Sequence, residues 1–238
     1  GDKVALLSNN MPNWGVVYFT ATIHGLVIVP ILPDFSEPEI DRIILHSEAK
    51  ALVASDKLYT KVSKEVIAGL SLVVRSMNLG VISHRKAAAR GVVSVPRSED
   101  LAAIIYTSGT TSEPKGVMLS HGNLCSELAM VSVLQPVYPT DIFLSILPLS
   151  HTFECSLGML LPFMWGAQVV YLDKAPTASV LLPVLRAVRP TIMLSVPLII
   201  EKIYKYKVVP QLSSNRLMRW LYGREWGRKW LHRIAGKK

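Results

Sequence analysis

Near its middle, the sequence reads Tyr106-Thr107-Ser108-Gly109-Thr110-Thr111-Ser112-Glu113-Pro114-Lys115-Gly116. The apolar run 101–106 leads into this stretch. The stretch contains five Ser and Thr hydroxyls, an early glycine and a single lysine. Glycine lets a phosphate approach the backbone closely, hydroxyl and N–H groups donate to its oxygens, and lysine supplies compensating charge. We therefore expect a phosphate-binding loop, with a surface turn between two strands as the simpler alternative.

This loop does not follow the Walker pattern. That pattern places a glycine directly before the lysine and a hydroxyl residue directly after it, whereas Pro114 precedes Lys115 and Gly116 follows it here. The next residues, 117–119, are apolar and typical of a strand. The lysine is thus expected to be followed by a strand rather than by a helix.

The rest of the chain alternates short apolar runs with amphipathic stretches, which predicts an α/β fold with layered, mostly parallel sheets and helices on both faces. Strands are predicted at residues 4–7, 26–31, 51–54, 72–74, 101–106, 117–119, 141–147, 166–171 and 190–197. Helices are predicted at residues 12–23, 36–47, 58–70, after a cap at 120–123, after Thr177, and at 198–206. The helix at 36–47 is the best specified, because Ser36 and Glu39 form a capping box.

Apolar residues on every side of residues 157–165 predict that this segment is completely buried, with Trp165 in the core. Residues 75–100 lose the alternating pattern and are expected to form a surface connection. His46 and His84 belong to no group of candidate residues and are expected to be solvated.

A second informative stretch, Pro148 to Glu154, follows a predicted strand and contains His151. Open α/β sheets bind ligands at the carboxyl ends of their strands, so His151 is a candidate site residue and Glu154 a weaker one. A polar residue that only begins a helix is the alternative for His151.

Composition excludes several classes of protein. Half of the 238 residues are apolar, which suffices for a sizeable core. Cys125 and Cys155 offer neither a disulfide framework nor metal-ligand spacing, which suits a reducing cytoplasm. No secretory signal pattern occurs at residues 1–23. The uncharged run at 14–33 contains a helix stop at Gly25, so a buried helix and strand are expected there instead of a membrane span.

The formal net charge of +9 is concentrated near the C-terminal end, where 11 of the 26 Lys and Arg lie from Lys202 onward against one acid, Glu225. Residues 215–238 are expected to form a basic packing helix. Docking on anionic lipid or on nucleic acid is the open alternative for this tail.

The loop at 106–116 resembles the phosphate loop of the adenylate-forming enzymes, which include acyl-CoA synthetases, luciferases and peptide-synthetase adenylation domains. It departs from their usual pattern at Ser112, where the family has glycine; a serine with positive φ there costs on the order of 1 kcal/mol more. Residues 9–14 resemble the family's opening helix, to which we assign no chemistry. Residues 189–206 resemble the long-chain fatty acyl-CoA synthetase branch.

This resemblance implies that residues 1–238 are the first part of the large N-terminal AMP-binding domain, without the C-terminal domain. It implies an acid–thiol ligase that activates a long-chain fatty acid with ATP to acyl-AMP and transfers the acyl group to coenzyme A, while the chain alone is inactive. It also implies an acyl tunnel beside residues 148–153 and 191–196.

By the same resemblance, the catalytic residues are Lys115 and His151, and Thr107 is a Mg²⁺ ligand. The residues that hold the nucleotide phosphates are Thr107, Ser108, Gly109, Thr110, Thr111, Ser112 and Lys115. A non-catalytic nucleotide or acyl binding module, or a ligase for another carboxylic acid or a carrier-protein thiol, would carry the same motifs. The expected location is the cytoplasm, and no nucleic-acid partner is expected. Peripheral membrane contact and the oligomeric state are left open.

Overall fold

The computed structural model describes residues 1–85, 95–107, 114–208, 210 and 224. Five candidate loop residues, Ser108, Gly109, Thr110, Thr111 and Ser112, and all but one residue of the basic tail lie outside these ranges. The chain divides into two compact units, Gly1–Asp173 with Pro190–Leu194, and Lys174–Arg189 with Ser195–Lys238. Each unit is described by itself.

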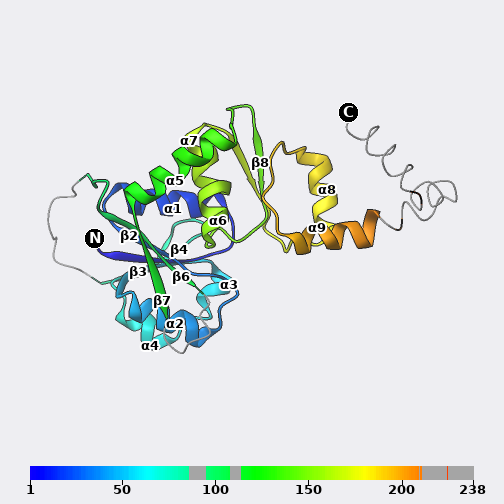
Figure 1. Cartoon of the computed structure of the whole chain (residues 1–238). Helices are drawn as coiled ribbons and strands as arrows, with labels where there is room; N and C mark the ends of the chain where they lie inside the picture. The colour runs from blue at the N-terminus through cyan, green and yellow to red at the C-terminus, as the bar shows by residue number, and fades with distance from the viewer. Residues whose placement is uncertain (86–94, 108–113, 209, 211–223, 225–238) are drawn as a thin grey trace. The chain divides into compact units, whose positions relative to one another are not determined.

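The first unit is built on a seven-stranded sheet with the strand order β5-β4-β3-β1-β2-β6-β7 (Figure 1). Five neighbouring strands are parallel: β1 (Lys3–Leu7), β2 (Val27–Pro30), β3 (Ala49–Ala54), β4 (Leu72–Arg75) and β6 (Leu101–Thr107). The two edge strands, β5 (Val81–His84) and β7 (Lys115–Ser120), are antiparallel to their neighbours. The predicted mostly parallel sheet is confirmed.

Helices cover both faces of this sheet (Figure 1). One face carries α1 (Pro12–Ile23), α5 (His121–Leu134), α6 (Thr152–Glu154), the π-helical turn η1 (Cys155–Leu160) and α7 (Leu161–Met164). The other carries α2 (Glu37–His46), α3 (Asp56–Tyr59) and α4 (Lys64–Gly69). Each face has its own apolar core, with Trp14 and Tyr18 buried in the first and Ile40 in the second.

The start of α2 shows how the sequence specifies one of these helices. The side-chain carboxylate of Glu39 accepts a hydrogen bond from the Ser36 N–H at 2.8 Å, as the capping box predicts. The apolar stripe of the helix, with Ile40, Ile43 and Ile44, then faces the sheet. The predicted helix is therefore confirmed together with its cap.

A second, two-stranded parallel sheet in the same unit consists of β8 (Ile142–Ser145) and β9 (Gln168–Tyr171). The chain returns to the free edge of β8 at Ile192, whose carbonyl accepts from the Leu144 N–H at 3.0 Å. The strand predicted at 190–197 is thus reduced to a single bridge. In the second unit, α8 (Ala178–Val188) buries Leu181, and α9 (Pro197–Ile203) continues into the π-helical turn η2 (Tyr204–Val208).

Two predictions between residues 58 and 100 need correction. The helix predicted at 58–70 is two short helices, α3 and α4, because the Ser63 hydroxyl accepts from the Val66 N–H at 3.3 Å and starts a new helix. The Ser63 N–H is itself bound by the Asp41 carboxylate at 3.1 Å. The expected surface connection at 75–100 contains strand β5, which pairs with β4 and was not predicted.

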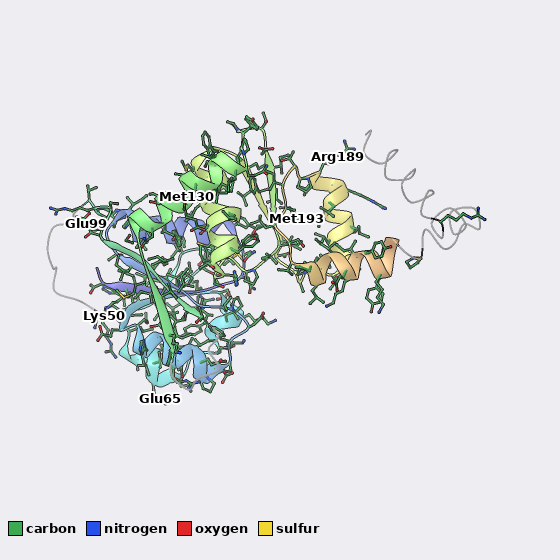
Figure 2. The ribbon with its side chains drawn as sticks, in the orientation of Figure 1. Lys50, Glu65, Glu99, Met130, Arg189 and Met193 are labelled. Atoms are coloured by element: carbon green, nitrogen blue, oxygen red, sulfur yellow. The ribbon has the colours of Figure 1, made fainter. Side chains whose placement is uncertain are left out.

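The prediction of complete burial for residues 157–165 is also wrong. Met159, Leu160 and Leu161 are buried, but Phe163 is 65% exposed and Trp165 is 41% exposed. The Trp165 indole N–H donates to the Ser132 hydroxyl at 3.0 Å instead of entering the core. With exposed Met130 of α5 (Figure 2), the residues of α7 leave apolar side chains on the surface of this unit.

The uncharged run at residues 14–33 forms α1 and β2, so the expectation of a helix followed by a buried strand is confirmed. Among the described residues, none of the helices has the length and apolar character needed to cross a membrane.

Candidate functional site

The β6–β7 hairpin places two candidate residues side by side. Thr107 and Lys115 are cross-strand partners at the loop end of this hairpin, directly on either side of residues 108–114. Both side chains are exposed to solvent. Thr107 is also the last residue of a parallel strand, so this pair lies at the carboxyl edge of the main sheet, where open α/β sheets receive ligands.

The strand that carries Lys115 must pass very close to the buried ring of Tyr106. A Cβ on Gly116 would lie 2.7 Å from Ile104 Cγ2 and 3.2 Å from Tyr106 Cζ. Glycine therefore allows the backbone of β7 to pack on β6 at this rung. The requirement for glycine after Lys115 is thus explained by packing on β6.

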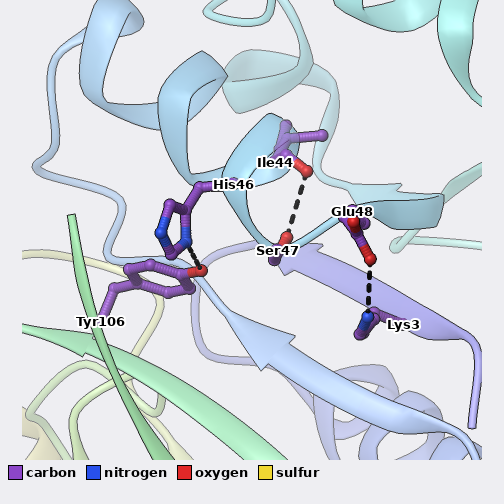
Figure 3. A network of polar contacts seen from close by, with 6 residues as sticks. All are labelled: Lys3, Ile44, His46, Ser47, Glu48 and Tyr106. Atoms are coloured by element: carbon purple, nitrogen blue, oxygen red, sulfur yellow. Dashed lines mark hydrogen bonds and ion pairs between the residues drawn. The ribbon is translucent and has the colours of Figure 1, made fainter. Parts of the chain in front are cut away.

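His46 holds the outer end of the same tyrosine (Figure 3). Its Nδ1 lies 2.8 Å from the Tyr106 hydroxyl, and the two rings meet edge to face with centroids 5.7 Å apart. Burial raises the pKa of Tyr106, so this hydroxyl stays neutral at physiological pH. His46 is exposed, as expected, but it is not isolated, since it joins α2 to the strand that enters the candidate loop.

His151 lies beyond the carboxyl end of β8 and begins α6. Its Nδ1 accepts a hydrogen bond from the Phe153 N–H at 3.3 Å, and its ring is exposed. Because Nδ1 is an acceptor, the proton of the neutral imidazole lies on Nε2. The Nε2–H group has no partner among the described residues, so it can meet a ligand while the ring is held through Nδ1 by the backbone of residue 153.

Glu154, the weaker candidate, does not face solvent. It is 1% exposed, and neither carboxylate oxygen has a hydrogen-bond partner within ordinary geometry among the described residues. Burial raises the pKa of Glu154 to about 7, although the nearby Ser145 hydroxyl and Ile146 N–H act to lower it. Glycine at 158 makes room for this carboxyl group, since a Cβ there would lie 2.8 Å from its carbon. Glu154 is therefore enclosed within the first unit and is not exposed to a ligand at its surface.

Asn10, to which the sequence analysis gave no chemistry, contacts the segment that leads to His151. Its side-chain amide donates to the Leu147 carbonyl at 2.6 Å, and its side-chain oxygen accepts from the Leu149 N–H at 2.9 Å. These partners are more than 130 residues away in the sequence, so no local pattern could reveal the contact. The carboxyl end of β1 is thereby joined to the loop that follows β8.

The structure therefore brings Thr107 and Lys115 together and presents His151 at the end of the second sheet. Among the described residues, no group of three His, Cys, Asp or Glu side chains could hold a metal ion. The exposed Thr107 hydroxyl does suit Mg²⁺, which prefers oxygen ligands and commonly shares one or two protein oxygens with substrate phosphates.

An α/β unit whose sheet edge carries Thr107 and Lys115 on either side of a Ser- and Thr-rich sequence is typical of nucleotide-binding proteins. The sequence comparison is more specific: the model of the AMP-binding enzyme family matches residues 1–235. This chain belongs to that family of ligases, as the resemblance of its phosphate loop predicted.

Individual relatives agree with this assignment. The chain is similar to peroxisomal long chain acyl-CoA synthetase 7 of Arabidopsis thaliana, with 29% identity over 86% of this chain and 32% of the relative. It is similar to the chloroplastic long-chain-fatty-acid–[acyl-carrier-protein] ligase AEE15 of the same plant, with 30% identity over 90% of this chain and 33% of the relative. The chain thus spans about a third of the length of the curated relatives it matches.

A solved structure matches the fold as well. ATP-bound MatB of Rhodopseudomonas palustris superposes with a TM-score of 0.72 and 26% identity, over 87% of this chain and 41% of that one. The mixed α/β architecture is accordingly that of the N-terminal domains of adenylate-forming enzymes.

Proposed function

We propose that the protein containing this chain is a long-chain fatty acid:CoA ligase. It activates the acid with ATP to an acyl-adenylate, releases pyrophosphate, and passes the acyl group to the thiol of coenzyme A. The single observation that carries the proposal is the β6–β7 hairpin, which sets Thr107 and Lys115 on either side of the hydroxyl-rich loop in a chain of the AMP-binding family.

The chemistry needs little more than positioning and charge. The carboxylate of the acid attacks the α-phosphorus of ATP, and negative charge develops on the departing pyrophosphate. Lys115, at the loop end of the β6–β7 hairpin, compensates that charge. The backbone and hydroxyl groups of the loop donate to the phosphate oxygens, and these residues are Ser108, Gly109, Thr110, Thr111 and Ser112. Mg²⁺ bound with the nucleotide would neutralise further phosphate charge, with Thr107 among its ligands.

His151 is proposed to lie against the acyl group and the nascent adenylate. Its ring is fixed through Nδ1 by the Phe153 N–H, so Nε2–H is the group available to the substrate. The fatty chain is proposed to run beside residues 148–153 and 191–196. Neither role requires a side-chain nucleophile, because the acid itself attacks.

Coenzyme A is the proposed acceptor because the similar synthetase relatives are named for it. A carrier-protein thiol is the second candidate, since one relative of similar identity is named for an acyl-carrier protein. Supplying the two acceptors in parallel, with the same acyl-adenylate, decides between them. We place the reaction in the cytoplasm, where the free thiols of Cys125 and Cys155 stay reduced.

Replacing Lys115 with alanine in the full-length enzyme tests the proposal. Adenylate formation should fall on the order of 100-fold, because one well-placed charge on the leaving group is lost. Lys50→Ala, which removes an exposed lysine at the other end of the sheet's strands (Figure 2), is the matched control and should leave the rate unchanged. Pyrophosphate release near the wild-type rate in Lys115→Ala would exclude this lysine from the reaction.

A further inference from the structure

Most of the hydrogen-bonding capacity of the Asn10 side chain goes to one distant segment, residues 145–149. Its Nδ2 donates to the Leu147 carbonyl at 2.6 Å and to the Ser145 hydroxyl at 3.2 Å, and its Oδ1 accepts from the Leu149 N–H at 2.9 Å. An asparagine amide can make about four hydrogen bonds in total. Three of them are therefore made to the end of β8 and the residues that follow it.

Asn10 does not serve its own helix. The residue before α1 is Met11, and this N-terminus has no side-chain cap. The usual reason for an asparagine at this place, a cap on the following helix, therefore does not apply. The amide is directed away from α1 and toward Leu147 and Leu149 instead.

The segment that Asn10 holds, residues 147–149, leads directly to His151. Pro148 stands between the two residues that Asn10 holds, and its carbonyl accepts from the His151 N–H at 3.0 Å. The His151 carbonyl then accepts from the Cys155 N–H at 2.9 Å, and the His151 ring accepts from the Phe153 N–H. Asn10 thus holds the two residues beside Pro148, and Pro148 in turn is hydrogen-bonded to the backbone of His151.

Burial makes these contacts matter energetically. Ser145 and Leu149 are each 1% exposed, so water cannot readily replace a hydrogen bond that is lost at these positions. A buried polar group without a partner is costly. Removal of the Asn10 amide would leave the Leu149 N–H and the Leu147 carbonyl to find new partners, and the segment would shift to supply them.

We propose that Asn10 is a positioning residue for His151, which fixes the 147–149 segment and through it the ring that faces the acyl group. This kinetic consequence rests on the function proposed above, whereas the structural one does not. Asn10 acts through other residues and touches neither substrate nor reacting atoms.

A matched control lies three residues away. The Asn13 amide donates to the carbonyls of Ser76 and Met77, both at 2.8 Å, in the β4–β5 connection. Asn13→Ala therefore removes similar side-chain hydrogen bonds from the same part of the chain, but not those to the His151 segment. A change seen in both variants would indicate general destabilisation, whereas a change seen only in Asn10→Ala would indicate that Asn10 positions His151.

The first measurement is amide hydrogen exchange on the present chain. Asn10→Ala should speed exchange at Leu149 and at Phe153, whose N–H reports the His151 ring, about tenfold relative to wild type. Asn13→Ala should leave both amides within about threefold of wild type. Unchanged exchange at these two amides in Asn10→Ala, or equal changes in both variants, would overturn the proposal.

The second measurement uses the full-length enzyme. Asn10→Ala should lower kcat/KM for the fatty acid about tenfold with the KM for ATP unchanged, and Asn13→Ala should change neither. If Asn10→Ala does not fold, Asn10→Asp is the second variant. It keeps an oxygen for the Leu149 N–H but loses the hydrogen bonds donated to Leu147 and Ser145. It should likewise lower kcat/KM for the fatty acid and leave the KM for ATP unchanged. If the wild-type enzyme forms no acyl-adenylate, the proposed function fails, and the exchange data alone decide the role of Asn10.

Discussion

Replacement of Glu154 with glutamine should stabilise the protein above neutral pH. The side chain is 1% exposed without a hydrogen-bond partner for either oxygen among the described residues, and burial raises its pKa from 4.5 to about 7. At about 1.4 kcal/mol per pKa unit, this difference amounts to about 3 kcal/mol between the charged and neutral forms. Glutamine has nearly the same shape and remains neutral, so it fits beside Gly158 without adding volume.

The pH dependence follows from proton linkage. Because the pKa is raised on folding, the native state holds a proton that the unfolded state releases between pH 4.5 and about 7. The free energy of unfolding of the wild type should therefore fall across that window relative to Glu154→Gln. Below pH 4.5 the carboxyl group is neutral in both states, so the two proteins should agree there within about 1 kcal/mol. At pH 8 the variant should be more stable by up to about 3 kcal/mol.

Urea unfolding followed by circular dichroism, at several pH values from 4 to 8, measures this difference. Glu65→Gln, at an exposed glutamate on α4 (Figure 2), is the control and should follow the wild-type curve. Parallel stability curves for wild type and Glu154→Gln would refute the reasoning. So would a variant that is less stable than wild type at pH 8, since Glu154 would then be stabilising as a charged group.

Three further predictions concern the β6–β7 hairpin, the proposed acyl tunnel and the chain as a whole. Gly116→Ala should destabilise the protein by about 1–3 kcal/mol in urea unfolding, because its Cβ would clash with Ile104 at 2.7 Å; wild-type stability would contradict the packing of β7 on β6. If Ser195 lines the proposed acyl tunnel, Ser195→Trp in the full-length enzyme should shorten the preferred acid and leave the KM for ATP unchanged, whereas a wild-type chain-length profile would contradict that proposal. The present chain, which spans 32% of a relative, should form no detectable acyl-AMP with palmitate. It should bind ATP in calorimetry more weakly than about 1 mM, since solvated phosphates contribute little net free energy, and detectable acyl-AMP would contradict this.

Local sequence patterns predicted most of the fold. The boundaries of α1 and the capped start of α2 agree with the structure, because caps, helix stops and apolar periodicity act over a few residues. The alternation of strands and helices likewise predicted a parallel sheet covered on both faces. The break at Ser63 was missed although a cap residue was present, since an apolar pattern that continues across it favoured one long helix.

What the sequence could not predict depends on partners far along the chain. β5 is short and largely exposed, and only pairing with the edge of β4 makes it a strand. The exposure of Phe163 and Trp165 depends on which elements cover α7, which an all-apolar segment does not reveal. In the candidate site, Lys115 and His151 were proposed from local motifs, whereas the contacts of Asn10 and His46 join residues 60 or more positions apart.

The position of β7 at the end of the sheet has a consequence for handling the chain in solution. No further strand pairs with its outer edge among the described residues, and Val117 and Met118 on this strand are 48% and 66% exposed. An open edge with unpaired backbone groups, β-branched and apolar side chains and one lysine is a template for strand addition between molecules. This edge is therefore a site of aggregation in concentrated samples, and a charged residue in place of Met118 is the direct way to suppress it.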